Sequence, residues 1–271
     1  LVLEDGRRTG DLAHAGPDHA VGIDPLTAQR SQVVRGAAGL LYGGNALGGG
    51  VNVIRGGGPR TVAPRWTGTA TLQGESVNDG LAGGGAVQVG LAERFALRGE
   101  LSVRRAGDVR TPVGTLGPTR LSGLNASIGA SWVQPWGYAG LAVRQYTLDH
   151  SVPGVFEGDT IPGAHPGGAD LETRRRAARF EVRHLAGLGP FAAVELEGNI
   201  VHYEHDEIEG FGDQVRIVGS QFDQLMGTLD LRLTHDHDAG SVRTQGTVGA
   251  SAFWPDLRAA GSFPGSRSAR E

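Results

Sequence analysis

The sequence predicts an all-β chain, most of which is a partial transmembrane antiparallel β-barrel. Two observations carry this prediction: apolar and polar residues alternate with a period of two after Pro64, and long and short connections alternate between these segments. Residues that alternate in this way lie on opposite faces of a strand. One segment has Phe95, Leu97, Leu101 and Val103 on one face and Arg98, Glu100, Ser102 and Arg104 on the other.

The alternation predicts nine strands, at residues 66–76, 84–92, 94–106, 120–133, 137–149, 173–186, 190–204, 222–235 and 241–254. Segments of this length can cross a bilayer at a tilt, which takes ~9–11 residues. Strands of soluble proteins are shorter, at ~5–6 residues. Because bacterial single-chain barrels use an even number of strands, nine strands predict an incomplete barrel that does not insert stably alone.

The connections predict which side of the membrane each strand end faces. Longer connections at 77–83, 106–119, 149–172 and 205–221 alternate with tight ones, as extracellular loops alternate with periplasmic turns in outer-membrane barrels. A soluble β-sandwich or a β-repeat fold is the alternative, but charged residues on one face of each strand argue against the dry interior of a sandwich. We expect aromatic residues near strand ends to form interfacial girdles: Trp66, Trp132, Trp136, Tyr138, Tyr146, Tyr203 and Trp254.

Composition excludes several classes of function. The chain has no cysteine, so disulfides and thiolate metal sites are absent, and its formal net charge of −4 gives no electrostatic case for nucleic acid. It has no apolar run long enough for a membrane helix. No G-x-S-x-G, H-E-x-x-H or comparable catalytic motif occurs, so we expect no enzyme and no required cofactor.

The glycine-rich run at residues 33–54 is the most distinctive local feature. It lacks the G-K-[ST] and the G-x-G-x-x-G of phosphate-binding loops, and its large apolar residues distinguish it from a flexible linker. The run resembles the end of the plug domain of TonB-dependent outer-membrane receptors. The motif residues are Arg35, Gly36, Tyr42, Gly43, Asn45, Gly48, Gly49 and Asn52.

The resemblance implies a plug lodged in a barrel of about 22 strands in the outer membrane of a Gram-negative bacterium. It implies import of a scarce nutrient with energy from the TonB–ExbB–ExbD complex. We therefore expect a C-terminal part of a plug domain at 1–60, an N-terminal part of a barrel at 61–254 and an irregular tail at 255–271. The TonB-contacting box is not in this sequence, which we interpret as a fragment. We also expect Arg35 to tether the plug to a wall carboxylate such as Glu100 or Glu195.

Candidate metal ligands concentrate in two consecutive outer connections. We expect imidazole and carboxylate groups to converge at the outer mouth and to bind a divalent cation such as Zn²⁺, or a metal chelate: His150, His165, His202, His205 and Glu207. The segments 149–154, 203–210 and 218–222 resemble a zinc- or haem-uptake subgroup of these receptors. A solvated acidic loop with incidental histidines is the alternative. The cluster His235 to Asp238 falls in a predicted periplasmic turn and is interpreted as a turn cap.

The leading hypothesis is thus a fragment of a TonB-dependent receptor that imports a metal ion or metal chelate, such as zinc, haem or siderophore-bound iron. Two alternatives stay open. One is an adhesive or structural outer-membrane barrel without transport, and the other is a truncated, non-functional gene product.

Overall fold

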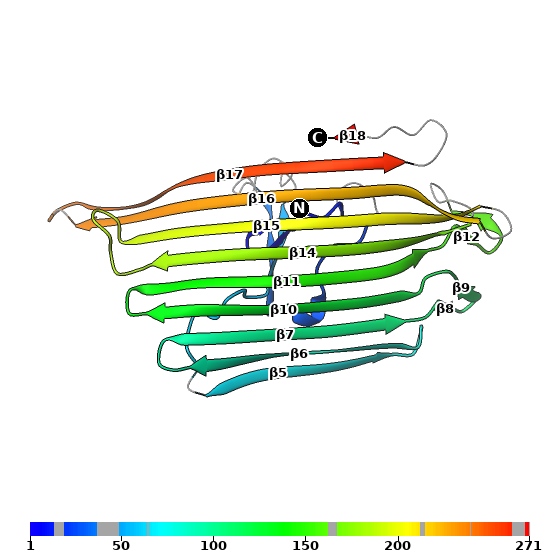
Figure 1. Ribbon diagram of the computed structural model, residues 1–271, viewed down its shortest axis with the longest axis horizontal. Helices are drawn as coiled ribbons and strands as arrows, with labels where there is room; N and C mark the ends of the chain where they lie inside the picture. Colours follow the sequence, from blue (N-terminus) through cyan, green and yellow to red (C-terminus); the bar gives the residue numbers. More distant parts are fainter. Residues whose placement is uncertain are drawn as a thin grey trace.

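The computed structural model describes residues 1–13, 19–36, 49–63, 65–161, 167–211, 215–238, 240–261 and 269–270. A small inner sheet lies against one face of a large antiparallel wall (Figure 1). We call the wall face toward the inner sheet the inner face, and the opposite one the outer face. No helix among these residues is long and apolar enough to cross a membrane.

The wall is a ten-stranded sheet with the order β18-β17-β16-β15-β14-β11-β10-β7-β6-β5. Its strands are β5 (Trp66–Glu75), β6 (Gly80–Leu91), β7 (Phe95–Ala106), β10 (Leu121–Gln134), β11 (Gly137–Val152), β14 (Ala169–His184), β15 (Ala193–Phe211), β16 (Val215–Asp238), β17 (Arg243–Gly261) and β18 (Ala269–Arg270). The nine predicted strands are all present. Because β5 and β18 are the two ends of this sheet, it is a partial, unclosed barrel, and the predicted fold class is confirmed.

Several strands are longer than the sequence predicts at the end where the long connections lie. Strands β15 and β16 pair from Ala193–Thr234 to Phe211–Val215, so the predicted long loop at 205–221 is wrong. The prediction failed because the outward residues there are polar, which ends the apolar alternation without ending the strand. Strand β17 likewise runs to Gly261, into the tail expected to be irregular.

Two of the predicted long connections contain short hairpins. The connection after β7 forms β8 (Val109–Thr111) with β9 (Gly114–Leu116), and the one after β11 forms β12 (Val155–Phe156) with β13 (Asp159–Thr160). Both hairpins project at the same end of the wall (Figure 1). This end is the predicted extracellular one.

The inner sheet has the order β2-β1-β4-β3, from β1 (Val2–Glu4), β2 (Arg7–Arg8), β3 (Arg30–Val34) and β4 (Gly50–Ile54). β1 and β4 are parallel, and the other pairs are antiparallel. A 3-10 turn, η1 (Pro25–Thr27), precedes β3, and the Asp24 carboxylate caps it by accepting a 2.9 Å hydrogen bond from the Leu26 amide. Asp24 also accepts a 2.5 Å bond from Ser102 on β7, which holds the turn against the wall.

Burial along the wall strands follows the predicted alternation. On β7, Leu101 and Val103 are half-exposed on the outer face, whereas Glu100 and Ser102 are buried against the inner sheet. The predicted aromatic girdle is only partly right. Trp66, Trp132 and Trp254 are exposed, but the tyrosines at 138, 146 and 203 are buried on the inner face. The Tyr138 hydroxyl donates to the Glu181 carboxylate there, a partner that position near a strand end does not reveal.

Candidate functional site

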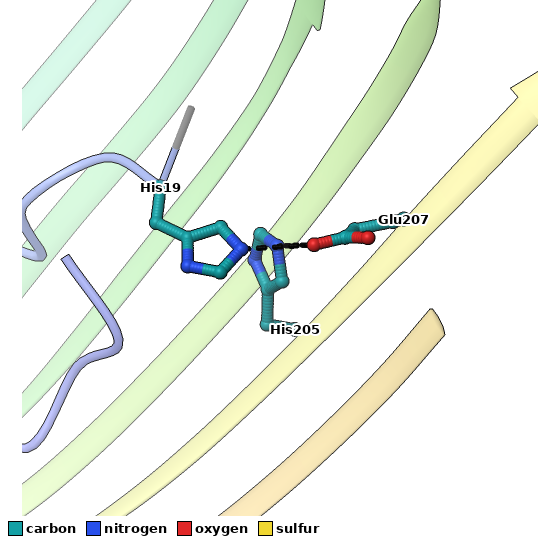
Figure 2. A group of neighbouring side chains, drawn as sticks. All are labelled: His19, His205 and Glu207. Atoms are coloured by element: carbon teal, nitrogen blue, oxygen red, sulfur yellow. Dashed lines mark hydrogen bonds and ion pairs between the residues drawn. The ribbon is translucent and has the colours of Figure 1, made fainter. Parts of the chain in front are cut away.

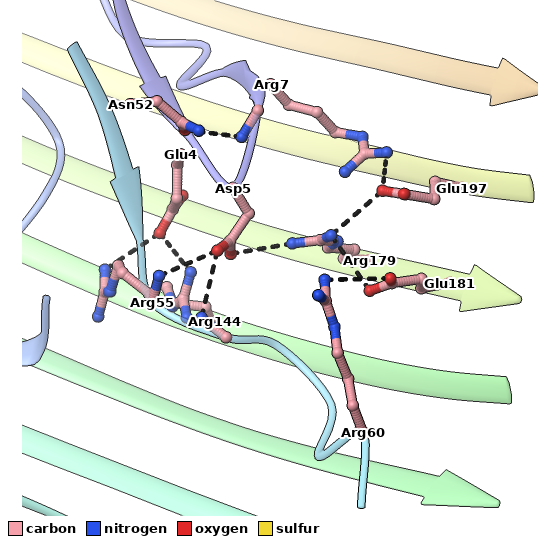
Figure 3. Close-up of polar contacts among 12 residues, drawn as sticks. Glu4, Asp5, Arg7, Asn52, Arg55, Arg60, Arg144, Arg179, Glu181 and Glu197 are labelled. Atoms are coloured by element: carbon pink, nitrogen blue, oxygen red, sulfur yellow. Dashed lines mark hydrogen bonds and ion pairs between the residues drawn. The ribbon is translucent and has the colours of Figure 1, made fainter. Parts of the chain in front are cut away.

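The inner sheet is held to the wall by buried ion pairs centred on Glu4 (Figure 3). The Glu4 carboxylate lies 2.7 Å from Arg175 of β14 and 3.2 Å from Arg55, and it also binds Arg144 of β11. Arg55 follows β4 and is fully buried; it reaches Glu100 at 2.8 Å and Asn125 at 2.7 Å. Glu4 therefore meets positive charge from both the inner part and the wall, and Arg55 meets negative charge from both.

This ion-pair network sets the protonation of Glu4. Burial acts to raise the pKa of Glu4, but Arg175, Arg144 and Arg55 outweigh it and hold the pKa well below its usual range. Glu4 is therefore a carboxylate at neutral pH. Removing one member of a buried ion pair typically destabilises by ~3–5 kcal/mol, because the remaining charge is left uncompensated.

A second cluster of ion pairs lies beside the first and also joins the inner sheet to the wall (Figure 3). Arg179 of β14 bridges Asp5 of the inner sheet at 2.9 Å and Glu197 of β15 at 3.2 Å. Arg7 of β2 binds Glu197, and Arg60 reaches Glu181 at 3.2 Å. The two clusters give the inner sheet a defined position against strands β7 to β15.

The predicted tether through Arg35 is wrong. Arg35 is exposed, and the ion pairs of Glu100 are with Arg55 and Arg98. Glu195 pairs instead with Arg183 and Arg232. The tether is Arg55, which stands directly after the recognised motif and carries no distinguishing sequence signal.

The other plug-motif residues have structural roles where they are described. The Asn52 side chain accepts a 2.7 Å bond from the Gly6 amide and donates to Gln32 at 3.1 Å, which links three parts of the inner sheet. Gly49 has φ +111°, and a Cβ there would lie 2.3 Å from the Val34 carbonyl oxygen. Gly36 also has positive φ, at +72°. Tyr42, Gly43, Asn45 and Gly48 lie outside the described residues.

We call the part of the chain that precedes the wall and carries the inner sheet the inner domain. A group of possible metal ligands joins it to the wall (Figure 2). Nε2 of His19 lies 2.8 Å from Oε1 of Glu207, and Nε2 of His205 lies 3.6 Å from the same oxygen. One ligand atom from each of these residues lies within 4.8 Å of the other two. We call His19, His205 and Glu207 the triad. His19 belongs to the segment between β2 and η1, and the other two belong to β15.

Hydrogen bonds orient both imidazoles of the triad. Nδ1 of His19 lies 3.0 Å from the Leu12 carbonyl oxygen, which can only accept, so Nδ1 carries a proton. Nδ1 of His205 lies 3.0 Å from the Thr173 hydroxyl. Both Nε2 atoms therefore point to Glu207. With no metal, the His19–Glu207 bond needs a second proton on His19, whereas a cation there would take that proton's place.

The predicted ligands divide between the two faces of the wall. His205 and Glu207 are together on the inner face. His150 shares that face, because the wall pairs it with Leu171 and Leu171 with Glu207 in one row. Two strand spacings place it roughly 10 Å from Glu207. His202 is on the outer face, where its Nε2 lies 3.0 Å from Asp223, so its predicted convergence with His205 is wrong. His165 lies outside the described residues.

Sequence reasoning missed His19. It stands 188 positions from Glu207, in a segment without strand pattern, so nothing local marks it as a partner of the wall. The period-two rule could have separated His202 from His205, because an odd spacing on one strand puts two side chains on opposite faces.

Comparisons with known proteins agree with this architecture. Residues 1–50 match the family model described as TonB-dependent Receptor Plug Domain. Three similar solved structures are the copper transporter OprC (TM-score 0.76, 17% identity, 95% of this chain and 38% of that chain), the siderophore receptor PiuA from Acinetobacter baumannii (0.72, 11%, 99% and 40%), and the ferric-catecholate import receptor Fiu from E. coli K12 (0.67, 15%, 97% and 40%). At these identities the likeness establishes the fold, and the chain spans about two fifths of each of these structures.

Proposed function

We propose that this chain is part of a TonB-dependent outer-membrane transporter that imports a metal ion or a metal chelate. The plug family match over residues 1–50 and the wall fold support the class of protein. Each of the three structures above is named as a transporter or receptor for copper, a siderophore or a ferric catecholate. The localisation follows from the class: the outer membrane of a Gram-negative bacterium, with wall strands in contact with lipid.

The observation that carries the proposal is the fully buried Arg55 between Glu4 and Glu100. A plug held by such pairs is closed at rest, because separating them exposes several charges at once. Buried ion pairs typically cost ~3–5 kcal/mol when broken on one side. Opening a path therefore needs an external source of energy, which fits coupling to a TonB–ExbB–ExbD complex.

The cargo is inferred from the triad. Two imidazoles with Nδ1 hydrogen-bonded to oxygen atoms and one carboxylate suit a borderline divalent cation such as Zn²⁺. The site lies between plug and wall, where a bound cation touches both. Haem or an iron siderophore is the competing cargo, because the same ligands could meet the metal of a chelate.

Transport in cells tests this proposal. In a strain that lacks the chromosomal copy, we expect the complete receptor to restore zinc uptake, and we expect uptake to cease when TonB is deleted. His205→Ala should abolish uptake. His202→Ala is the matched control, because it removes the same group from the same strand on the outer face, and it should leave uptake intact.

The outcomes separate the parts of the proposal. TonB-dependent zinc uptake that persists in His205→Ala would show that the triad is not the cargo site, while leaving the proposed class of protein intact. If the complete receptor restores no TonB-dependent uptake of zinc, haem or siderophore iron, an adhesive or structural barrel is favoured.

A further inference from the structure

A small cavity lies between the inner sheet and the wall, beside the two clusters of ion pairs. Its volume is about 30 Å³, which is enough for one water molecule or one small anion. The wall leaves this space because alanines stand next to arginines there: the register pairs Ala142 with Arg179, and Arg144 with Ala177. The inner sheet covers the space with the turn from β1 to β2, and Gly57 closes one side.

Arginine side chains from both parts of the protein line this cavity. Arg144 of β11 and Arg179 of β14 approach it from the wall, and Arg7 of β2 approaches it from the inner sheet, where its side chain is only 6% exposed. Each of the three has a buried nitrogen with no protein acceptor within hydrogen-bond distance: Nη1 of Arg7, Nε of Arg144 and Nε of Arg179. A buried donor without an acceptor is costly, so these groups favour an acceptor inside the cavity.

The charge around the cavity favours an anion over water. Counted by direct ion pairs among the described residues, the cluster around Glu4 joins only two carboxylates, Glu4 and Glu100, to four arginines: Arg55, Arg98, Arg144 and Arg175. The second cluster, with the pairs that extend it, is balanced, since Arg7, Arg60, Arg179, Arg183 and Arg232 meet Asp5, Glu181, Glu195, Glu197 and Asp230. A buried excess of positive charge is costly unless negative charge compensates it.

The carboxylates that line the cavity are already engaged elsewhere. Asp5 accepts hydrogen bonds of 2.9 and 3.2 Å from the amides of Arg55 and Gly56, and Glu4 is shared by three arginines. The lining also includes the side chain of Asn199 on β15, which is buried and uncharged. Its amide can donate to an anion, whereas another carboxylate at this place would repel one.

We propose that this cavity binds a small monovalent anion such as chloride, which bridges the inner sheet to the wall. Arg7 would bind the anion from the inner sheet, and Arg144 and Arg179 would bind it from the wall, through charge-assisted hydrogen bonds. Because the anion contacts both parts, it binds only the docked arrangement and strengthens docking by mass action. The proposal concerns how the inner sheet is held, and it depends neither on the cargo nor on the triad.

Amide hydrogen exchange of the complete receptor tests the bridge. At constant ionic strength, protection of β1 and β4 should rise with chloride, roughly tenfold at a concentration ~10 times the dissociation constant. Gluconate, which is too large for the cavity, replaces chloride in the reference buffer. Screening by salt would weaken the surrounding ion pairs equally with either anion. Equal protection in the two buffers would therefore overturn the proposal.

Asn199→Asp supplies the negative charge from the protein itself, in a side chain of the same shape. In gluconate, we expect β1 and β4 of this variant to be protected as in the unsubstituted receptor at saturating chloride, and added chloride should change nothing. The matched control is Asn125→Asp, which adds the same charge at a buried position 2.7 Å from Arg55, outside the lining of the cavity. It should keep the chloride response. Loss of the response in both variants would reduce the effect to total charge and overturn the site.

Anomalous diffraction from crystals of the complete receptor grown in bromide locates the anion independently of exchange. We expect a bromide peak among Arg7, Arg144 and Arg179, and no peak in Asn199→Asp. Ordered water without an anomalous signal would overturn the anion site, and a peak without any chloride response in exchange would overturn the bridging role. Zinc uptake is measured separately, so failure of the transport proposal leaves each of these outcomes decisive.

Discussion

His19 of the inner domain and Glu207 of the wall are joined by a 2.8 Å bond across 188 positions of sequence. The Glu207 oxygen that accepts this bond also lies 3.6 Å from Nε2 of His205. This one carboxylate therefore connects the part of the chain that would move during transport with the part that would stay in the membrane.

Metal affinity should depend on His19 as well as on the wall. We expect His19→Ala and His205→Ala each to weaken Zn²⁺ binding by more than ~100-fold, because loss of even an outer partner of a metal ligand costs ~10–100-fold. Calorimetric titration of the complete receptor measures this. His237→Ala, on the outer face of β16, should bind with unchanged affinity. Equal Zn²⁺ affinities in His19→Ala, His205→Ala and the control variant would show that the triad does not bind the metal.

Metal binding should also fall in mild acid. Histidine must be neutral at Nε2 to ligate, and its ordinary pKa is ~6.5. Protons compete with the cation for the imidazole nitrogens, so the apparent affinity for Zn²⁺ should drop steadily from about pH 7 to pH 5. A flat profile over this range would exclude histidine ligands.

Docking of the inner sheet should respond to acid in a different range. The pKa of Glu4 is depressed in the folded state, so its contribution is complete above its unfolded value of about 4.5 and is lost only as pH falls through the lower folded value. Amide hydrogen exchange of β1 and β4 should therefore show equal protection, after correction for intrinsic rates, at pH 7 and pH 5. Loss of protection already at pH 5 would contradict the assigned role of Glu4.

Substitution of Glu4 should release the inner sheet without unfolding the wall. Glu4→Gln leaves Arg55, Arg144 and Arg175 without their shared carboxylate, and we expect a loss of ~3–5 kcal/mol in docking. Hydrogen exchange would detect it as lost protection in β1 and β4 with β10 and β11 unchanged. Glu93→Gln, at an exposed turn, is the control and should change neither. Retained protection in Glu4→Gln would mean that Asp5 and Arg179 suffice.

Any side chain at Gly49, directly before β4, should destabilise the inner sheet. Gly49→Ala combines a positive φ with a Cβ 2.3 Å from the Val34 carbonyl oxygen, so we expect ~1–3 kcal/mol of destabilisation confined to the inner sheet. Thermal unfolding followed by exchange in β3 and β4 measures it. Gly74→Ala, where an added Cβ meets nothing within 4 Å, should be nearly neutral. A neutral Gly49→Ala would show that the turn can rearrange.

The sequence predicts the wall well because its signal is repeated in every strand. Alternation such as Leu101 against Glu100 recurs across nine strands, and the strand boundaries it misses lie where polar residues replace the apolar ones, as at His205 to Gln221. The site is predicted less well, because its contacts are between distant segments. Arg55 and His19 have no local pattern, and their partners become visible only when the inner sheet is placed against β7 and β15.

The register of β15 fixes His205 and Glu207 before any ligand arrives, so binding costs little ordering of these two groups. Only His19 depends on where the inner domain stands. If one cation bridges all three, binding and docking become reciprocal: each strengthens the other by the same factor. A force that pulls the inner domain away from the wall would then lower the affinity for the cation as it opens a path through the barrel. Release of the cation would require no separate trigger.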